Sequence, residues 1–327
     1  MKQILSKILR EYEQRRMDAI ARMESKKAEV YKLVPRLLEI DNELSEIGLS
    51  LVKLALSGDE TKAGELRIIA KELQAERDEL MQLHGNYIIP SFLCSSCNDT
   101  GFLANSRCSC LRQRLIEEYY DMSNLRSILE VENFDTFDER IFNSAKAQGA
   151  PRSQKGMMRD IRNIAVDFVD TFSSEFNNLL FYGDAGLGKT FLCHCIAKAL
   201  LDKGHSVLYL TAPRFCRFAE DYRFNRDILD APEEMMQLID DVDLLIIDDL
   251  GTEFPTVITV AAIFDVINNR ILTKKSTIVS TNLNLKERVE IYSERVESRF
   301  IGFYEVLTFC GDDLRKRKRE QKGKLGK

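Results

Sequence analysis

The stretch GDAGLGKT, residues 183–190, decides the fold. It fits the pattern G-x-x-x-x-G-K-[ST] in full, with an apolar segment, NLLFYG, before it and a segment of helical character, FLCHCIAKALLDKG, after it. Glycines let the backbone curl so that several N–H groups point inward at phosphate oxygens, and the N-terminus of the following helix adds partial positive charge. Strand, loop and helix in this order predict a binding site for a nucleoside triphosphate.

Lys189 and Thr190 carry the chemistry of this loop. The lysine can reach the β- and γ-phosphates, and the threonine hydroxyl can ligate Mg²⁺. Downstream, the apolar run LLII ends in Asp248 and Asp249, and open α/β sheets place their ligands at the carboxyl ends of strands. One carboxylate can hold the Mg²⁺ shell while its neighbour polarises an attacking water. The predicted nucleotide contacts are Asp248 and the whole loop, that is Gly183, Asp184, Ala185, Gly186, Leu187, Gly188, Lys189 and Thr190.

Two later motifs can complete the site, each with a simpler alternative. Asn282 ends the buried segment STIVSTN, so its amide can orient water or the γ-phosphate, or it simply turns the chain. In ERVESRF, Arg295 and Arg299 lie one helical turn apart, and a planar guanidinium suits a γ-phosphate bound by a neighbouring subunit. The alternative for both arginines is surface salt bridging with Glu294 and Glu297.

From Val131 onward, apolar segments of strand character alternate with helical ones. They are rich in β-branched and aromatic residues, and each is expected to be buried on both faces. This alternation predicts an α/β domain in which helices cover both sides of a parallel sheet. The five expected strands are 178–183, 206–212, 243–250, 276–282 and 304–309.

The first 88 residues have a different pattern, rich in Glu, Lys, Arg and Leu. One helix is expected from Lys2 towards Leu33, ending near Pro35, and Ser57 with Gly58 break the next one. Apolar residues recur in steps of three and four, which predicts a small antiparallel helical bundle with a solvated charged face. The apolar positions are Ile40, Leu44, Ile47, Leu51 and Leu54 in the second helix, and Ile69, Leu73, Leu80 and Leu83 in the third.

Four of the eight cysteines fall in CSSCNDTGFLANSRCSC, residues 94–110. The N-terminus is broken by charge every few residues, and no apolar run approaches the roughly 20 residues of a membrane span, so we expect a cytoplasmic protein and no membrane partner. In that reducing compartment, clustered cysteines are more often metal ligands than disulfides. Cys94, Cys97, Cys108 and Cys110 are therefore predicted to form a closed structural zinc site, with redox or disulfide use and coincidence as the alternatives.

Taken together, GDAGLGKT, LLIIDDLG, STN and ERVESRF resemble the motifs of an AAA+ ATPase, and more closely those of the DnaC/DnaI helicase-loader group, with its transposition-helper relative IstB. The cysteine segment and VENFDTFD (131–138) also look like this group. The resemblance implies an AAA+ fold around the five-stranded parallel sheet. Few residues follow the last expected strand, so little or no lid is expected, which departs from the usual pattern of the family. The resemblance also implies that Lys189 and Thr190 form Walker A, Asp248 is the Walker B metal residue, Asp249 the catalytic acid, Asn282 sensor 1, Arg299 the arginine finger and Arg315 the sensor 2 arginine.

The segment TAPRFCRFAEDYRFN corresponds to a helix that lines a single-stranded DNA channel in this group. The resemblance therefore implies DNA contacts from Arg214, Phe215, Arg217 and Arg223, whereas Phe218 is expected to face the core. The net charge of −5 requires any nucleic-acid affinity to come from such local patches. The basic tail LRKRKREQKGKLGK is weak evidence for DNA binding, because charge runs are usually solvated.

The function implied is an ATP-dependent loader that places a hexameric replicative helicase on single-stranded DNA, self-associates, and uses ATP and Mg²⁺ as a switch and Zn²⁺ as a structural ion. The alternatives are an IstB-like transposition helper, a small-molecule P-loop kinase and a non-catalytic nucleotide-binding adaptor. The expected domains are 1–90 for helicase binding, 91–112 for the zinc knuckle, 113–130 for a connector helix and 131–327 for the ATPase.

Overall fold

A computed structural model describes residues 2–57, 60–84, 89–104, 106–122, 125–146, 152–224 and 232–317. Gly58 and residues 318–327 of the basic tail, which the sequence analysis singled out, lie outside this described part. The chain divides into two compact units: Leu9–Cys108, and Ser109–Lys327 together with Met1–Ile8. In the described part of the chain, no helix combines the length and apolarity that crossing a membrane requires.

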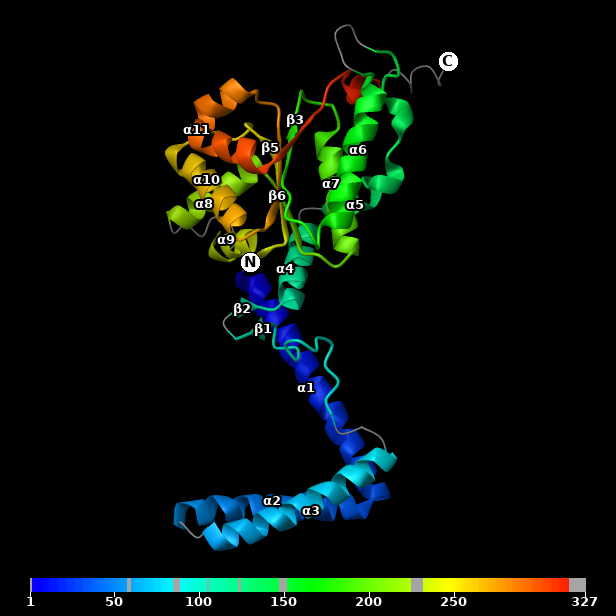
Figure 1. The fold of residues 1–327 in the computed structure, drawn as a ribbon, viewed down its shortest axis with the longest axis vertical. Helices are drawn as coiled ribbons and strands as arrows, with labels where there is room; N and C mark the ends of the chain where they lie inside the picture. Colours follow the sequence, from blue (N-terminus) through cyan, green and yellow to red (C-terminus); the bar gives the residue numbers. More distant parts are fainter. Residues whose placement is uncertain are drawn as a thin grey trace. The chain divides into compact units, whose positions relative to one another are not determined.

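The helical unit is built from α1 (Lys2–Leu33), α2 (Pro35–Ser57) and α3 (Glu60–His84). Pro35 starts α2, because a proline is tolerated at the first position of a helix but not in its interior. α2 and α3 lie side by side (Figure 1), and Arg36 of α2 donates two hydrogen bonds to the Glu76 carboxylate of α3, at 2.9 and 3.0 Å. The contacts of α1 with this pair come from its last turns, where Lys27 lies 3.7 Å from Asp41 and Tyr31 donates to Asp41.

The apolar stripe of α2 is confirmed, because all five predicted positions are buried or half-buried, and Leu37, which is 1% exposed, extends it. In α3, the side chain of the predicted Leu83 lies outside the described part of the chain, and one of the other predicted positions is wrong. Ile69 is 46% exposed, and the packed side of the helix runs through Ala63, Leu66, Ala70 and Leu73 instead. Because Leu73 is buried, the packed side can continue either through Ile69, four positions earlier, or through Ala70, three positions earlier. In α3 it continues through Ala70.

The second unit contains a five-stranded parallel sheet, and its order is β4-β5-β6-β3-β7. All five predicted strands form, within one or two residues of the expected bounds: β3 (Leu179–Tyr182), β4 (Val207–Thr211), β5 (Leu244–Leu250), β6 (Ser276–Thr281) and β7 (Glu305–Thr308). The expectation of burial on both faces is wrong for β7. Val306 is 47% exposed, and Leu307 is the one residue of β7 that is buried.

Helices cover both faces of this sheet (Figure 1), as the alternating pattern predicted. One layer holds α6 (Gln154–Thr171) and α7 (Lys189–Asp202), with α5 (Leu125–Val131) packed on α7. The other layer holds α8 (Ala212–Arg223), α9 (Pro232–Asp241), α10 (Val257–Leu272) and α11 (Leu285–Phe303). The remaining elements are α4 (Ser109–Met122), the 3₁₀ turns η1 (Phe134–Thr136) and η2 (Glu139–Ile141), and the two-residue strands β1 (Phe102–Leu103) and β2 (Ser106–Arg107).

The parallel arrangement places every loop that follows a strand at one edge of the sheet. The glycine loop follows β3, and Asn282 follows β6. Asp248 and Asp249 are among the last residues of β5 itself. From β3 the chain passes the positions of β6 and β5 to form β4, and then returns to fill β5 and β6. The strand order therefore reverses beside β3. Ligands of open α/β sheets bind at such reversal points.

Candidate nucleotide-binding site

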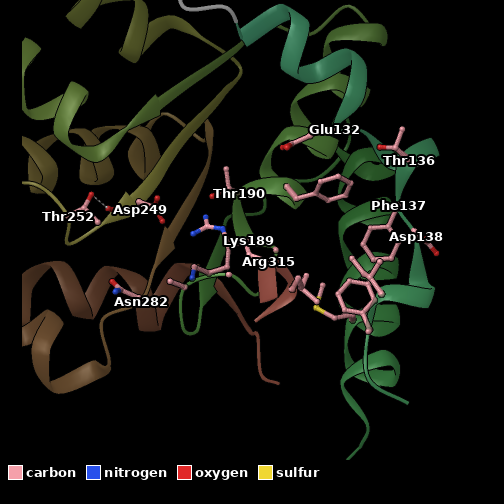
Figure 2. A pocket seen from close by; sticks show the side chains of 18 residues that line it. Glu132, Thr136, Phe137, Asp138, Lys189, Thr190, Asp249, Thr252, Asn282 and Arg315 are labelled. Carbon is pink, nitrogen blue, oxygen red and sulfur yellow. Dashed lines mark hydrogen bonds between the residues drawn. The ribbon is translucent and has the colours of Figure 1, made fainter. Parts of the chain in front are cut away.

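A pocket of about 550 Å³ opens at this edge, and Figure 2 shows its wall. Residues from separate parts of the sequence line it: Glu132, Thr136, Phe137, Asp138, Ile141, Phe142, Met158, Ala185, Gly186, Gly188, Lys189, Thr190, Phe191, Asp249, Thr252, Asn282, Leu314 and Arg315. Five of the residues predicted as loop contacts belong to this wall, together with the predicted Asp249, Asn282 and Arg315. The structure therefore brings together residues of three of the four motifs, GDAGLGKT, LLIIDDLG and STN, with Arg315 from the segment after the last strand.

The glycine loop depends on the absence of side chains at two of its positions. Gly183 has φ +151°, and a Cβ there would lie 2.3 Å from the backbone oxygen of Phe309. Gly186 has φ +81°, and its Cβ would lie 2.3 Å from a carboxylate oxygen of Asp313. Both positions therefore require glycine for conformation and for space.

Lys189 is buried at the base of this loop. Its ammonium group donates to the carbonyl oxygens of Gly183 at 2.6 Å and Asp184 at 2.8 Å. Burial lowers the pKa of Lys189, while the charges of Asp249, Asp248 and Asp184 act in the opposite direction. The Lys189 ammonium group is held by two carbonyl oxygens near three carboxylates. Its side chain can therefore rotate toward a bound phosphate while the backbone of Lys189 stays in place.

The two aspartates at the end of β5 have different surroundings. Asp248 is 1% exposed and does not belong to the pocket wall in this structure. Asp249 lines the pocket, where desolvation and the neighbouring Asp248 raise its pKa, against the lowering effect of Lys189 and Arg315. The pairing of β5 with β6 shifts register between Ile247 and Leu250, so the aspartates sit in a bulge that turns Asp249 to φ +57°.

Arg315 reaches the pocket because the segment after β7 returns to the glycine loop. The Leu314 N–H donates to the Gly186 carbonyl at 2.9 Å, and the Arg315 N–H donates to the Asp313 carboxylate at 2.8 Å. Residues 314–317 form a helical turn there. Figure 2 shows Arg315 close to Lys189, with Asn282 and Asp249 farther along the same wall.

The part of the pocket that sequence reasoning did not assign is an aromatic wall. The ring of Phe137 lies 5.6 Å from that of Phe142 and 6.1 Å from that of Phe191, with Ile141 and Met158 beside them. Flat apolar walls of this kind accept a nucleobase. The signal was VENFDTFD, which contributes Glu132, Thr136, Phe137 and Asp138 to the wall.

Arg295 and Arg299 lie outside the pocket wall, in the second half of α11. α11 bends at Ser293, whose φ is +79°. Arg299 is half-buried against α10, where its Nε donates to Asn268 at 3.0 Å and its guanidinium lies 5.5 Å from the ring centre of Phe264. Arg295 is exposed and makes no hydrogen bond or ion pair with any residue that the structure describes.

The predicted DNA-contacting residues on α8 divide into two groups. Phe215 is fully buried in the core, so the prediction that it contacts DNA is wrong, and Phe218 is buried as expected. Arg214 is half-buried, with its guanidinium 4.9 Å from the ring centre of Tyr119. Arg217 and Arg223 are exposed, and the exposed aromatic side chains of Tyr222 and Phe224 lie at the same end of the helix.

The cysteine segment brings its four thiols together. One ligand atom of each of Cys94, Cys97, Cys108 and Cys110 lies within 4.8 Å of the others, and the sulfurs of Cys94 and Cys108 are 3.8 Å apart. A tetrahedral ion with bonds of about 2.3 Å to four sulfurs holds those sulfurs about 3.8 Å apart. The thiol set and its spacing therefore fit a single zinc ion.

Local hydrogen bonds also shape this segment. The buried carboxylate of Asp99 accepts from the backbone N–H groups of Leu93 and Cys94, both at 2.8 Å. The Gly101 N–H donates to the Cys97 sulfur at 3.3 Å, which stabilises a thiolate at that position. These bonds arrange Cys94 and Cys97 for a common partner.

The glycine loop, the buried lysine, the paired aspartates and the aromatic wall define a P-loop nucleotide-binding domain. Within this class, residues 157–304 match the family model "Bacterial DnaA ATPAse domain". The replicative helicase loader DnaC of Escherichia coli K12 is 29% identical over 154 residues, which are 47% of this chain and 62% of that protein. The chromosomal replication initiator DnaA of Lachnoclostridium phytofermentans is 32% identical over 127 residues, 38% of this chain and 27% of that one.

Among solved structures, the match to one described as "Crystal structure of the DnaC helicase loader" covers 53% of this chain and the whole of that chain, with a TM-score of 0.42 and 22% identity. In the sequence matches, this chain spans less than two thirds of the length of the curated DnaC relatives. The sequence matches and the site geometry agree on one domain type. Both support a DnaC-like AAA+ ATPase domain in the nucleotide-binding region.

Proposed function

We propose that this protein is an ATP-dependent replication factor that loads a hexameric replicative helicase onto single-stranded DNA. The observation that carries the proposal is the pocket, in which a complete phosphate loop, Asp249 and Asn282 face one another in a domain that is similar in sequence to the helicase loader DnaC. ATP binding and hydrolysis act as the switch between holding and releasing the helicase.

In the proposed cycle, the glycine loop and Lys189 bind the β- and γ-phosphates, and the aromatic wall of Phe137, Phe142 and Phe191 takes the base. Thr190 and Asp248 would hold Mg²⁺, which supplies charge neutralisation for the phosphates. Asp249 accepts a proton from the attacking water, and Asn282 orients that water. Arg315, delivered by the segment after β7, adds positive charge beside the phosphates.

The proposed partners are single-stranded DNA, a neighbouring copy of the chain and the helicase. They are assigned from the chemistry of the exposed residues and from the similarity to DnaC. Arg217 and Arg223 are exposed, and Arg223 stands between the exposed Tyr222 and Phe224 in the chain, so these residues can contact phosphates and bases of single-stranded DNA. Arg299 acts on the nucleotide of a neighbouring copy, since it lies outside its own pocket and its Nη groups make no hydrogen bond with the described residues. The helical unit and the zinc-bound cysteine segment bind the helicase.

The first experiment is a measurement of ATP hydrolysis by the full chain with and without single-stranded DNA. The proposal predicts magnesium-dependent hydrolysis that DNA increases, and its loss in Lys189→Ala. An adaptor in which nucleotide is only structural would bind ATP but show no hydrolysis under either condition, and that result contradicts the proposal.

A further inference from the structure

Asp248 is the most buried charged group at the site, and its carboxylate is held from two sides. Oδ1 accepts from the Ser280 hydroxyl and lies 3.9 Å from the Cys193 sulfur. Oδ2 accepts from the Tyr209 hydroxyl at 2.6 Å. A carboxylate that is 1% exposed requires such donors, because an ionised group without them is strongly destabilised in the interior.

Tyr209 reaches Asp248 from the neighbouring strand. In the register of β4 and β5, Tyr209 pairs with Ile246 and Thr211 pairs with Asp248, so the tyrosine lies diagonally across from the aspartate. The phenol hydroxyl donates to the Asp248 carboxylate from this position.

The ring of Tyr209 is in turn held by a buried histidine. The ring centre of His194 lies 4.8 Å from that of Tyr209, and the two rings are inclined at 53°. His194 is 4% exposed, and its Nδ1 lies 2.6 Å from the Glu132 carboxylate, which belongs to the pocket wall. Contacts therefore connect Glu132, His194, Tyr209 and Asp248 in a continuous series behind the phosphate loop.

We propose that Tyr209 is a positioning residue for the magnesium ion: its hydroxyl fixes the orientation of the Asp248 carboxylate, and His194, braced by Glu132, fixes the ring of Tyr209. This inference rests on the proposed nucleotide site and deepens it. A carboxylate whose rotation is limited by donors on both oxygens keeps one orientation available to the ion. Removal of such a donor typically costs about 10- to 100-fold in metal affinity.

The test compares Tyr209→Phe with Tyr120→Phe in the full chain. Each change removes one buried hydroxyl and keeps the ring, and the Tyr120 hydroxyl donates at 2.7 Å to the Val207 carbonyl on the same strand as Tyr209. The measurement is ATP affinity by calorimetry across a magnesium titration and again in excess chelator.

Tyr209→Phe should raise the magnesium concentration at half-effect by about 10- to 100-fold, with unchanged ATP affinity in chelator. Tyr120→Phe should leave both values at the wild-type level. A magnesium midpoint equal to that of Tyr120→Phe, or an equal loss of ATP affinity with and without magnesium, would overturn the positioning role while leaving the nucleotide site intact. A wild-type protein that binds no ATP at all would overturn both.

His194→Leu tests the brace separately. It removes the bond to Glu132 and changes the ring contact but leaves the hydroxyl of Tyr209 in place. The magnesium midpoint should rise in the same direction as in Tyr209→Phe and by a smaller factor. An unchanged midpoint in a folded protein would overturn the role of His194.

Discussion

Asp248 and Asp249 share one hydrogen-bond partner, Ser280, although the two aspartates face different environments. The Ser280 hydroxyl donates to the Asp248 carboxylate and accepts from the backbone N–H of Asp249 at 2.9 Å. This serine therefore fixes the bulge that buries one carboxylate and leaves the other in the pocket. That geometry is consistent with the proposed roles, in which Asp248 holds the metal and Asp249 activates water, and it is the basis of the first prediction.

Asp249→Asn should slow ATP hydrolysis by roughly 100-fold or more while ATP affinity stays within a few-fold of wild type. Asparagine suits the test because it tolerates the left-handed backbone that Asp249 adopts at φ +57°. Lys189→Ala should instead weaken ATP binding strongly, since it removes the charge at the base of the loop. Calorimetry and phosphate release measure the two effects, and an equal loss of binding in both variants would contradict the assigned roles.

The same substitution should change stability in a pH-dependent way. The pKa of Asp249 is raised on folding, so the folded protein holds its proton to higher pH than the unfolded chain, and stability falls as pH rises through that window. Without nucleotide or metal, Asp249→Asn should therefore raise the melting temperature at pH 7, by no more than about 2 °C because the group is exposed. The gain should shrink as the pH falls below the folded pKa. A gain that is constant with pH would contradict the charge-based explanation.

Zinc content tests the cysteine segment. The purified chain should contain about one zinc ion, and Cys97→Ser should release it and loosen the helical unit while ATP binding survives. Cys310→Ser is the matched control, because Cys310 is an exposed thiol outside the cluster. Elemental analysis of the three proteins gives the answer. Full zinc content in Cys97→Ser would exclude this ligand set.

Arg299→Ala should bind ATP normally and lose DNA-stimulated hydrolysis, because an arginine supplied by a neighbouring copy is worth about 10³-fold or more in rate. Mixing it with Lys189→Ala should restore part of the activity, since a mixed interface pairs one intact phosphate loop with one intact arginine. Arg295→Ala, one turn away, is the comparison. Recovery that requires Arg295 instead of Arg299 would transfer the role to Arg295, and no recovery from co-assembling proteins would contradict the trans assignment.

The sequence predicted the strands well and the packing of side chains less well. The strands were recoverable because β3 to β6 are buried over most of their length and are rich in apolar and β-branched residues. The same signal overestimated β7, since an apolar segment does not reveal whether both of its faces are covered. Phe215 was assigned to DNA because arginines flank it, but helical position decides its direction, and it points into the core.

The site was predictable where its residues are adjacent in the chain. The glycine loop and the Asp248–Asp249 pair are each one motif, so spacing alone identified them. The aromatic wall has a partial signal in VENFDTFD. The series from Glu132 to Tyr209 forms only when the segment after α5 packs with α7 and β4, and local sequence carries no signal for such contacts. The bulge that separates the environments of Asp248 and Asp249 depends on register with β6, and two adjacent aspartates cannot reveal it.

The most direct test of the central claim measures helicase retained on closed circular single-stranded DNA coated with single-strand binding protein. The replicative helicase encoded in the same genome is mixed with this DNA, with the full chain or its Lys189→Ala variant, and with or without ATP, and DNA-bound helicase is quantified after a salt wash. Loading predicts that helicase is retained with the wild-type chain and ATP and falls to the background of helicase alone with Lys189→Ala. Equal retention in the presence and absence of the protein would contradict the account.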